Sequence, residues 1–524
     1  MGGRARDARI WSLVGLGCVA AVVALGLAGA HVPPDPTQTE TPSSLDAEAD
    51  EPIAALLPGP LAAEKPALPV TQEAENLELV GHTPLEFRGS NTNVALSGDH
   101  AYVGFRADGT HEKAGVLVVD VSDPSDPTVV DRIGQPHQAE HGLSSPELRV
   151  WPDAGLLFVM NLKCEAVAHG CYNTEGASPT PDIEIYDVSG DNAADPEHVT
   201  TYVPRAQPHE FHLWIDPADP QRALLYQSMQ GGEADIVVAD VSEVPDGGDV
   251  VEIADWEPEE PIPHWLHSLS VHPDGQRAYL AHWEGGFLVL DTSEVAAGVL
   301  DPEMGLVTPV ENRADWSGPG AHSALKVPGR DVVWTTDESF GEYAKIPTIA
   351  GFERLTVGCP WTWARAIDVT DPADPEVLSS FKTAENTEAF CESAEGPLAS
   401  NTTTFSSHTP LVTEHLAVNS WFAGGLVVVD TTDPTAPEQV GNFRPRPIPA
   451  VTQEYPPGTQ GPYKVAMWSY PVVQDGLIYV VDARNGLYVL DYQGPHSEEI
   501  DELGFLQSNS NRGDADRLYG VTAS

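Results

Sequence analysis

Basic residues are scarce in this chain. Against 79 Asp and Glu there are only 26 Lys and Arg, so the formal net charge is −53. A phosphate backbone attracts proteins through lysine and arginine, so this composition excludes nucleic acid as a partner. It also disfavours an anionic membrane surface, which leaves an N-terminal anchor as the expected membrane contact. So acidic a surface favours solubility at high ionic strength and attracts cations.

Long apolar runs are absent after residue 30, and the one that occurs lies at the N-terminus. Three arginines precede Ile10–Gly29, which is apolar apart from Ser12, and small residues follow at Ala28–Ala30. We therefore expect residues 1–30 to be a secretory signal peptide or an uncleaved signal anchor, and the protein to be secreted or held at the cell surface.

Residues 31–70 lack any apolar period and are rich in Pro, Ala, Thr and Glu. This composition predicts a disordered linker. We expect residues 71–508 to form one folded domain and residues 509–524 to be a flexible tail.

Cysteine is also rare, with five residues in the chain, and Cys18 lies within the N-terminal apolar run. The other four fall into two local pairs. In an oxidising compartment an even number of cysteines predicts disulfides, which we expect between Cys164 and Cys171 and between Cys359 and Cys391. This pairing rests on proximity, since four cysteines allow three connectivities.

The usual catalytic motifs are missing as well. The chain has no G-x-S-x-G, no H-E-x-x-H and no P-loop. The motif-defined serine hydrolases, zincins and nucleotide hydrolases therefore find no support, and no catalytic residue can be named.

What the chain does contain is a repeat. Seven segments end in a β-branched run that closes on aspartate, at Asp120, Asp187, Asp240, Asp291, Asp368, Asp430 and Asp491. The aspartates recur roughly every 50 to 80 residues, and a repeat of this length built from short strands indicates a propeller. The predicted fold is all-β, a seven-bladed β-propeller. Ring closure could use a strand near residues 77–85 or one near residues 499–506, and the sequence leaves both open.

These segments resemble a known family. The phrase GLVVVDTTDPTAP at 425–437, with HAYVGF at 100–105 and GLIYVVDARNG at 476–486, is similar to the LVIVD repeats of secreted and surface proteins of bacteria and archaea. The resemblance extends over residues 77–495. It implies a β-propeller, export, and binding of a ligand or partner. A weaker likeness, in histidine placement only, is to the selenium-binding proteins and methanethiol oxidases, which resemble propellers with metal-binding histidines at the channel.

Histidines gather near the start of the strand that precedes each turn. Because the first strand of a blade lines the central channel, histidines from several blades would converge on one axial site. Neutral imidazole is a preferred ligand of Cu, Zn, Fe and Mn. The residues that we expect to ligate such a metal are His141, His212, His267, His322 and His408, with His209 and His264 as further candidates.

Two details of this site follow from strand geometry. In H-x-x-H on a strand the two imidazoles point to opposite faces, so one of each pair should face the axis, and we favour His212 and His267. Glu210 or Glu140 could orient a ring or complete the ligand set. The competing interpretation is that the histidines hydrogen-bond across blades and only hold the ring together.

The sequence thus predicts an exported LVIVD-type propeller that binds a protein or small-molecule ligand at a histidine-lined channel mouth. The alternative is a Cu- or Zn-dependent oxidoreductase or hydrolase that uses the same histidines. A third hypothesis is a purely structural surface component. No oligomerisation signal is visible, so we expect a monomer.

Overall fold

The structure is a computed structural model that describes residues 71–106, 113–134, 143–163, 180–230, 233–259, 262, 265–283, 285–316, 320–339, 359–393, 405–454 and 464–521. All of them belong to one compact unit, Ala67–Ser524. The predicted signal, the linker and the Cys164–Cys171 pair lie outside the described residues. Within the described part of the chain, no helix is long and apolar enough to cross a membrane.

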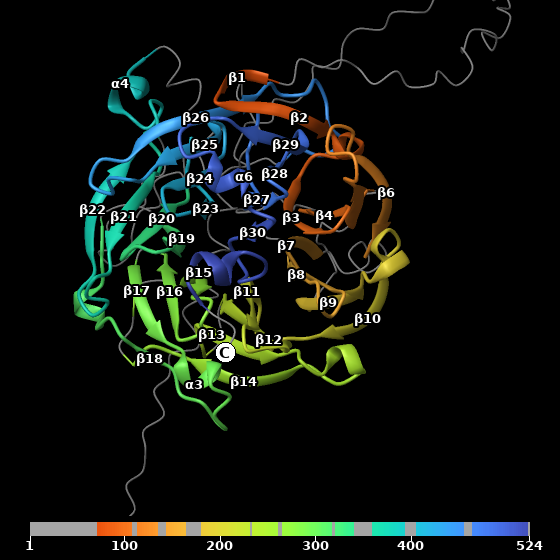
Figure 1. Cartoon of the computed structure of the whole chain (residues 1–524), viewed down its shortest axis with the longest axis vertical. Coiled ribbons are helices and arrows are strands. Elements are labelled where there is room, and N and C mark those ends of the chain that lie inside the picture. Colours follow the sequence, from red (N-terminus) through yellow and green to blue (C-terminus); the bar gives the residue numbers. More distant parts are fainter. Residues whose placement is uncertain are drawn as a thin grey trace, which may run out of the picture. The chain divides into compact units, whose positions relative to one another are not determined.

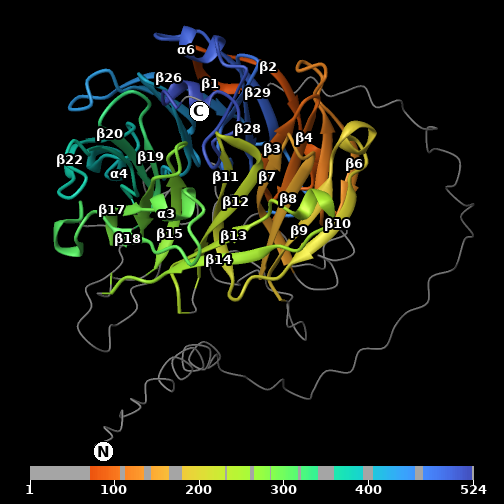
Figure 2. The same ribbon diagram turned by 60° about the horizontal axis from the view of Figure 1, so that its bottom comes forward.

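Seven antiparallel sheets stand around a common axis, as Figures 1 and 2 show, which confirms the predicted seven-bladed β-propeller. We number the sheets as blades in chain order. Blade 1 comprises β3 (Asn91–Ser97), β4 (His100–Phe105), β5 (Val116–Asp120) and β6 (Thr128–Ile133). Blade 2 comprises β7 (Leu143–Trp151), β8 (Leu156–Lys163), β9 (Asp182–Asp187) and β10 (Glu197–Tyr202). Blade 3 comprises β11 (Pro208–Asp216), β12 (Asp219–Met229), β13 (Ile236–Asp240) and β14 (Val251–Trp256).

Blade 4 comprises β15 (Leu266–Val271), β16 (Arg277–His282), β17 (Gly286–Asp291) and β18 (Gly305–Leu306). Blade 5 comprises β19 (Ala321–Lys326), β20 (Val332–Asp337), β21 (Ala364–Asp368) and β22 (Glu376–Phe381). Blade 6 comprises β23 (Pro410–Val412), β24 (Leu416–Trp421), β25 (Gly425–Asp430), β26 (Glu438–Pro445) and β1 (Thr71–Glu75). Blade 7 comprises β30 (Phe505–Gln507), β27 (Val472–Gln474), β28 (Leu477–Asp482), β29 (Gly486–Tyr492) and β2 (Leu77–Thr83).

Both chain ends close the ring. The N-terminal strand β2 pairs with β29 as the outer strand of blade 7, and the C-terminal β30 pairs with β27 on the inner edge of the same blade. The two alternatives left open by the sequence are therefore both realised, at opposite edges of one sheet. In addition, β1 pairs with β26 on the outside of blade 6.

The closing aspartates shape the turn after the third strand of each blade. The Oδ1 atoms of Asp120, Asp240 and Asp430 each accept the backbone N–H two residues further on, at 2.9, 2.9 and 2.8 Å. Such a side chain satisfies a turn amide that has no ladder partner. The β-branched run before the aspartate is buried on both faces, because a neighbouring blade covers each side of the sheet.

The hydrophobic core lies between blades rather than inside one. Each of the seven largest apolar clusters joins two successive sheets, such as Val418 and Val428 of blade 6 with Val480 and Leu490 of blade 7. A single blade therefore cannot bury its own faces, as expected of a repeat array.

Helices are short and lie in the connections: α3 (Ser293–Ala296), α4 (Glu388–Cys391), α6 (Glu498–Asp501), α7 (Ala515–Leu518), η2 (Leu85–Phe87), η3 (Gly190–Ala193), η4 (Val244–Asp246) and η5 (Val310–Asn312). A disulfide joins Cys359 to Cys391 at the end of α4, as the sequence predicted. The expected flexible tail differs from the structure, since Asn509, Asn511 and Ala515 are buried against the inner strands.

Candidate metal centre in the central channel

Three histidines enter the channel from β-bulges. The ladders between the first and second strands of blades 3, 4 and 5 shift register at His209, His267 and His322, so that each histidine is the extra residue at the start of its inner strand. A bulge bends the strand and re-aims the side chain that it carries. The same device in three successive blades therefore directs three imidazoles towards the axis.

Hydroxyl groups of the preceding blade fix the backbone of these histidines. Ser228 Oγ donates to the carbonyl oxygen of His267 at 2.7 Å. Ser268 Oγ donates in the same way to His322, and Thr336 Oγ1 to His408, which precedes β23 in blade 6. The histidine backbones thus do form cross-blade hydrogen bonds, while their rings remain available for another role.

The four rings form an arc across blades 3 to 6. Ring centroids are 4.4 Å apart for His209 and His267, 4.0 Å for His267 and His322, and 4.2 Å for His322 and His408. The Nε2 atoms of His209 and His267 are 3.0 Å apart. The imidazole nitrogens of four blades therefore converge on one small volume.

Two buried carboxylates face this arc. Glu210, on β11, is 6% exposed, and Glu338, directly after β20, is 3% exposed. Glu338 Oε2 lies 3.7 Å from the Nε2 atoms of both His267 and His322, and its Oε1 lies 3.3 Å from His408 Nε2. Glu210 Oε1 lies 3.7 Å from His322 Nε2 and from His267 Nδ1.

Hydrogen bonds on the far side of two rings fix their tautomers. His408 Nδ1 lies 2.7 Å from the carbonyl oxygen of Trp468, which has no proton to give, so Nδ1–H is the donor, and in the neutral ring Nε2 carries the lone pair. His322 Nδ1 contacts Ser323 Oγ at 2.8 Å. Ser323 in turn contacts Tyr470 OH at 3.1 Å, and Tyr470 donates to Glu210 Oε2 at 3.1 Å.

The donor and acceptor of each hydrogen bond in this series follow from its last member, Glu210. Because the Glu210 carboxylate accepts from Tyr470, Ser323 is left to donate to the Tyr470 oxygen and His322 Nδ1–H to donate to Ser323. The Nε2 lone pair of His322 then points at the carboxylates, like that of His408. Metal-ligating histidines commonly donate their other ring N–H to a carbonyl or hydroxyl in this way.

Burial sets the charge of the rings and of Glu210. It lowers the pKa of His267 and His322 well below 6.5 and that of His209 to about 3, so these imidazoles are neutral at pH 7. Burial, with the negative charge of Glu147 nearby, raises the pKa of Glu210 well above its usual range. A cation placed among these groups would reverse the penalty on the carboxylate.

Aromatic residues wall the arc. Trp283 and Phe422 directly follow the second strands of blades 4 and 6, the position that Glu338 has in blade 5. The rings of Trp283 and His267 stack at 5.2 Å, and Trp468 lies 4.4 Å from His408. Such walls exclude water and strengthen the electrostatic interactions of the groups that they enclose.

The structure brings together four of the candidates predicted from sequence: His267, His322, His408 and the further candidate His209. It places His212 elsewhere, in a cavity at the other end of the channel. The sequence favours His212 because it stands three residues before Ile215, a position matched in other repeats, whereas in the structure the bulge at His209 directs that residue into the arc. His141 and His264, like Glu140, lie outside the described residues.

Glu338 escaped the sequence analysis. It falls in no repeated phrase, because neighbouring blades carry an aromatic residue at its position. The signal that could have revealed it is a carboxylate at a blade position otherwise occupied by Trp or Phe.

Comparisons with known proteins agree with the repeat. The LVIVD repeat model matches residues 88–133 and 421–444, which lie in blade 1 and blade 6. The propeller thus contains LVIVD repeats at these two regions, where the predicted resemblance is confirmed. The comparisons do not show the weaker likeness to selenium-binding proteins. No curated protein matches the chain.

Several solved structures are similar to this chain. Sqt1 from Chaetomium thermophilum is 14% identical, with 79% of this chain and 86% of that chain covered and a TM-score of 0.42. The same protein bound to the N-terminus of the ribosomal protein L10 is 14% identical, with 79% of this chain and 89% of that chain covered and a TM-score of 0.42. The β-propeller domain of Cps50 (Swd1) from Myceliophteria thermophila is 10% identical, with 77% of this chain and 97% of that chain covered and a TM-score of 0.43. These likenesses carry no information about a ligand.

Proposed function

We propose that this propeller is an exported binding module whose channel holds one transition-metal ion, zinc or copper, among His209, His267, His322, His408 and Glu338. The observation that carries the proposal is the pairing of His408 Nε2 with Glu338 Oε1 at 3.3 Å. Because Nδ1–H donates to Trp468, the neutral form of the ring turns its Nε2 lone pair towards the Glu338 carboxylate in a buried site. Such a pair is repulsive unless a cation or a proton lies between them.

The spacing of the ligand atoms supports a shared ion. Two ligands of a tetrahedral ion with bonds of about 2.0–2.1 Å are about 3.3 Å apart. The nearest nitrogen–nitrogen and nitrogen–oxygen distances in the arc are 3.0, 3.3 and 3.7 Å. Imidazole with one carboxylate suits zinc and copper better than calcium or magnesium, which prefer oxygen ligands throughout.

A second candidate function is enzymatic, a metal-dependent oxidoreductase or hydrolase. Glu210 favours it, because its Oε1 faces the arc while its Oε2 is held by Tyr470. With its raised pKa, Glu210 could accept a proton from a water bound in the channel.

Export is part of the proposal and rests on the N-terminal sequence alone. The arginines, the apolar run and the small residues at 28–30 support it. N-terminal sequencing of the protein recovered outside the cell tests it, and a chain that remains inside with an intact N-terminus would contradict it.

The metal is tested by elemental analysis of the full chain, purified without chelators and reloaded separately with zinc and with copper. We expect about one ion per chain, lost in a His322→Ala/His408→Ala variant. The matched control is His100→Ala/His198→Ala, which removes two histidines outside the arc that are at least partly exposed. Wild-type protein that takes up no metal above background would leave the histidines with a packing role.

A further inference from the structure

The C-terminal segment Phe505–Tyr519, called the plug below, closes the channel at the end opposite the histidine arc. The histidines lie at the starts of the inner strands, whereas the plug contacts their ends, and Figure 1 shows β30 in the middle of the ring. Asn511 forms two hydrogen bonds of 2.7 Å with the backbone of Ile215 at the end of β11.

The plug is anchored to every blade. In blade 7 the anchor is the pairing of β30 with β27, and in blade 4 it is the contact of the Tyr519 ring with the His272 ring. Hydrogen bonds join Ser508 to Pro410 in blade 6, Tyr519 to Lys326 in blade 5, and Asn509 to Leu213 in blade 3. Further hydrogen bonds join Asn509 to Arg149 in blade 2 and Arg512 to Leu96 in blade 1. The space beneath the plug is therefore bordered by fixed groups.

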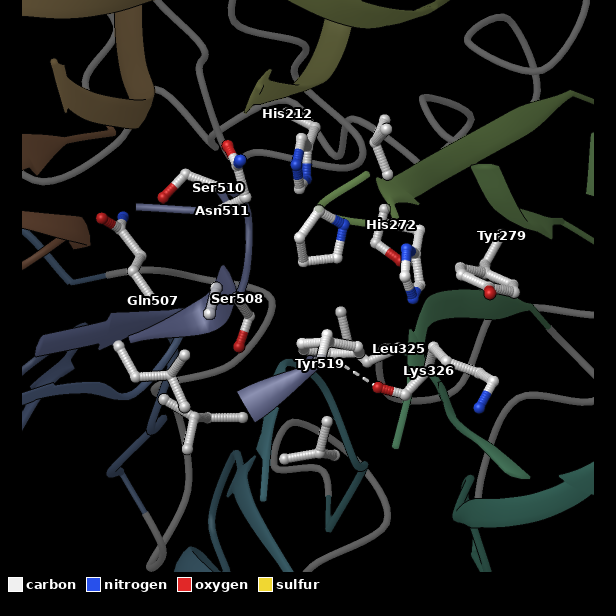
Figure 3. Close-up of a pocket in the computed structure, with 17 residues that line it drawn as sticks. His212, His272, Tyr279, Leu325, Lys326, Gln507, Ser508, Ser510, Asn511 and Tyr519 are labelled. Atoms are coloured by element: carbon white, nitrogen blue, oxygen red, sulfur yellow. Dashed lines mark hydrogen bonds between the residues drawn. The ribbon is translucent and has the colours of Figure 1, made fainter. Parts of the chain in front are cut away.

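A cavity lies between the plug and the inner strands, with a volume of about 40 Å³. One water molecule needs about 10–15 Å³ by this measure, so the cavity has room for a molecule of a few non-hydrogen atoms. Figure 3 shows the ring of His212 on one side and Tyr519 with Leu325 on the other. Polar groups of His212, Ser510 and Gln507 share the lining with apolar side chains such as Leu411 and Leu506.

His212 has no partner in this cavity. Its residue is 2% exposed, and neither Nδ1 nor Nε2 has a hydrogen-bond partner among the described residues. The amide of Gln507, 1% exposed, is also unpartnered there. Buried polar groups in native proteins are nearly always hydrogen-bonded, so two such side chains on one cavity indicate something that occupies it.

The lining argues against a charged occupant. It contains no Asp or Glu among the described residues that form it, so a cation would lack a counter-charge. One lysine, Lys326, belongs to the lining, but its ammonium already donates to Val327 O and Arg330 O and lies 3.9 Å from Asp331 Oδ1. The nearby guanidinium of Arg149 donates to Asn509 O, Leu148 O and Glu147 Oε2. An anion would therefore find no free positive partner, and an unpaired buried charge is costly.

We propose that this cavity binds a small uncharged molecule with an amide or hydroxyl group, which hydrogen-bonds to one nitrogen of His212 while its short aliphatic part lies against Leu325 and Leu411. The site is separate from the histidine arc and does not depend on a metal.

Equilibrium dialysis of the full, chelator-treated chain against radiolabelled acetamide tests the proposal, with isosteric acetate as the charged comparison. We expect saturable binding of one acetamide per chain and at least tenfold weaker binding of acetate. His212→Phe should weaken acetamide binding at least tenfold, whereas His212→Gln, which keeps a donor and an acceptor, should retain it within a few-fold.

Thermal melts establish whether both variants fold, and the comparison of acetamide with acetate on the wild-type chain stands even if His212→Phe does not. Acetamide that fails to saturate, or acetate that binds equally well, would overturn the proposal. So would a crystal grown with acetamide that shows only water at His212.

Discussion

His408 Nε2 and a carboxylate oxygen of Glu338 face each other between two neighbouring blades. His408 Nε2 lies 3.3 Å from Glu338 Oε1, while the Nδ1–H of the same ring donates to Trp468. The pair belongs to blades 6 and 5, so any cation that it holds also joins two blades. Metal binding and ring stability should therefore be linked.

The substitution Glu338→Gln should stabilise the protein in the absence of metal and destabilise it, relative to wild type, when metal is bound. Without metal, the Gln amide donates to His408 Nε2 and removes a buried charge, so the variant should melt at a higher temperature than wild type. With the ion at 100 times its Kd, wild type should gain about 2.7 kcal/mol and the variant much less. Melting curves with and without chelator measure both. Glu252→Gln, in an outer ion pair with Arg205, is the control and should respond equally in both conditions. Equal destabilisation by Glu338→Gln in the two conditions would contradict the site.

Tyr470→Phe should weaken metal binding without abolishing it. The hydroxyl holds the carboxylate of Glu210 and completes the chain that fixes the His322 tautomer. Loss of such an orienting contact costs about 10-fold to 100-fold in affinity, and loss of a hydrogen bond to a charged group about 2 kcal/mol in stability. Competition with a chromogenic chelator measures the affinity. Tyr102→Phe, which loses a 2.9 Å bond to Ala193 O in blades 1 and 2, should cost about 1 kcal/mol and leave the metal affinity unchanged. An unchanged affinity in Tyr470→Phe would separate this network from the metal.

Acid should weaken the closure of the ring through His82 on β2. Burial lowers the pKa of His82 to about 4, against 6.5 when unfolded, so below pH 6.5 the unfolded chain binds more protons. Stability contributed by neutral His82 is therefore complete above pH 6.5 and lost as the pH falls towards 4, by up to about 3 kcal/mol. His82→Gln should keep the bond to Asn485 O and flatten this dependence, as measured by denaturant unfolding between pH 7 and 4.5. An equally steep loss in the variant would assign the acid sensitivity to other groups.

The disulfide should stabilise blade 5. It joins cysteines 32 residues apart and encloses β21 and β22. A cross-link of this length restricts the unfolded chain by about 3–4 kcal/mol. Replacement of both cysteines by serine should lower the free energy of unfolding by that order, measured in denaturant without reductant. A loss below about 1 kcal/mol would mean that the native state is strained by the cross-link or that the unfolded chain stays compact.

The blades could be predicted because one side chain recurs for one local reason. Asp430 closes a buried strand and accepts the amide of Thr432, and the same contact follows the third strand of most other blades. Such a contact needs only neighbours in the sequence, so every copy of the repeat preserves it in readable form.

The arc was only partly predictable. His267, His322 and His408 share a place in the repeat, but the choice between His209 and His212 depends on a bulge, which has no sequence mark here. Glu338 is opposite to His408 only because the second strand of one blade ends beside the first strand of the next. Contacts of this kind depend on the assembled ring and not on any local pattern.

The pairing of β2 with β29 also has a consequence for how the chain is made. Glu78 and Gln493 contact each other 415 positions apart. Synthesis runs from the N-terminus, so β1 and β2 leave the ribosome first and must wait, with unpaired edges, until β26 and β29 exist. Such edges are prone to pair wrongly, and non-local strand pairing is slow. The last step of folding therefore belongs to the completed polypeptide, and a chain truncated before residue 486 would remain an open array without its seventh blade.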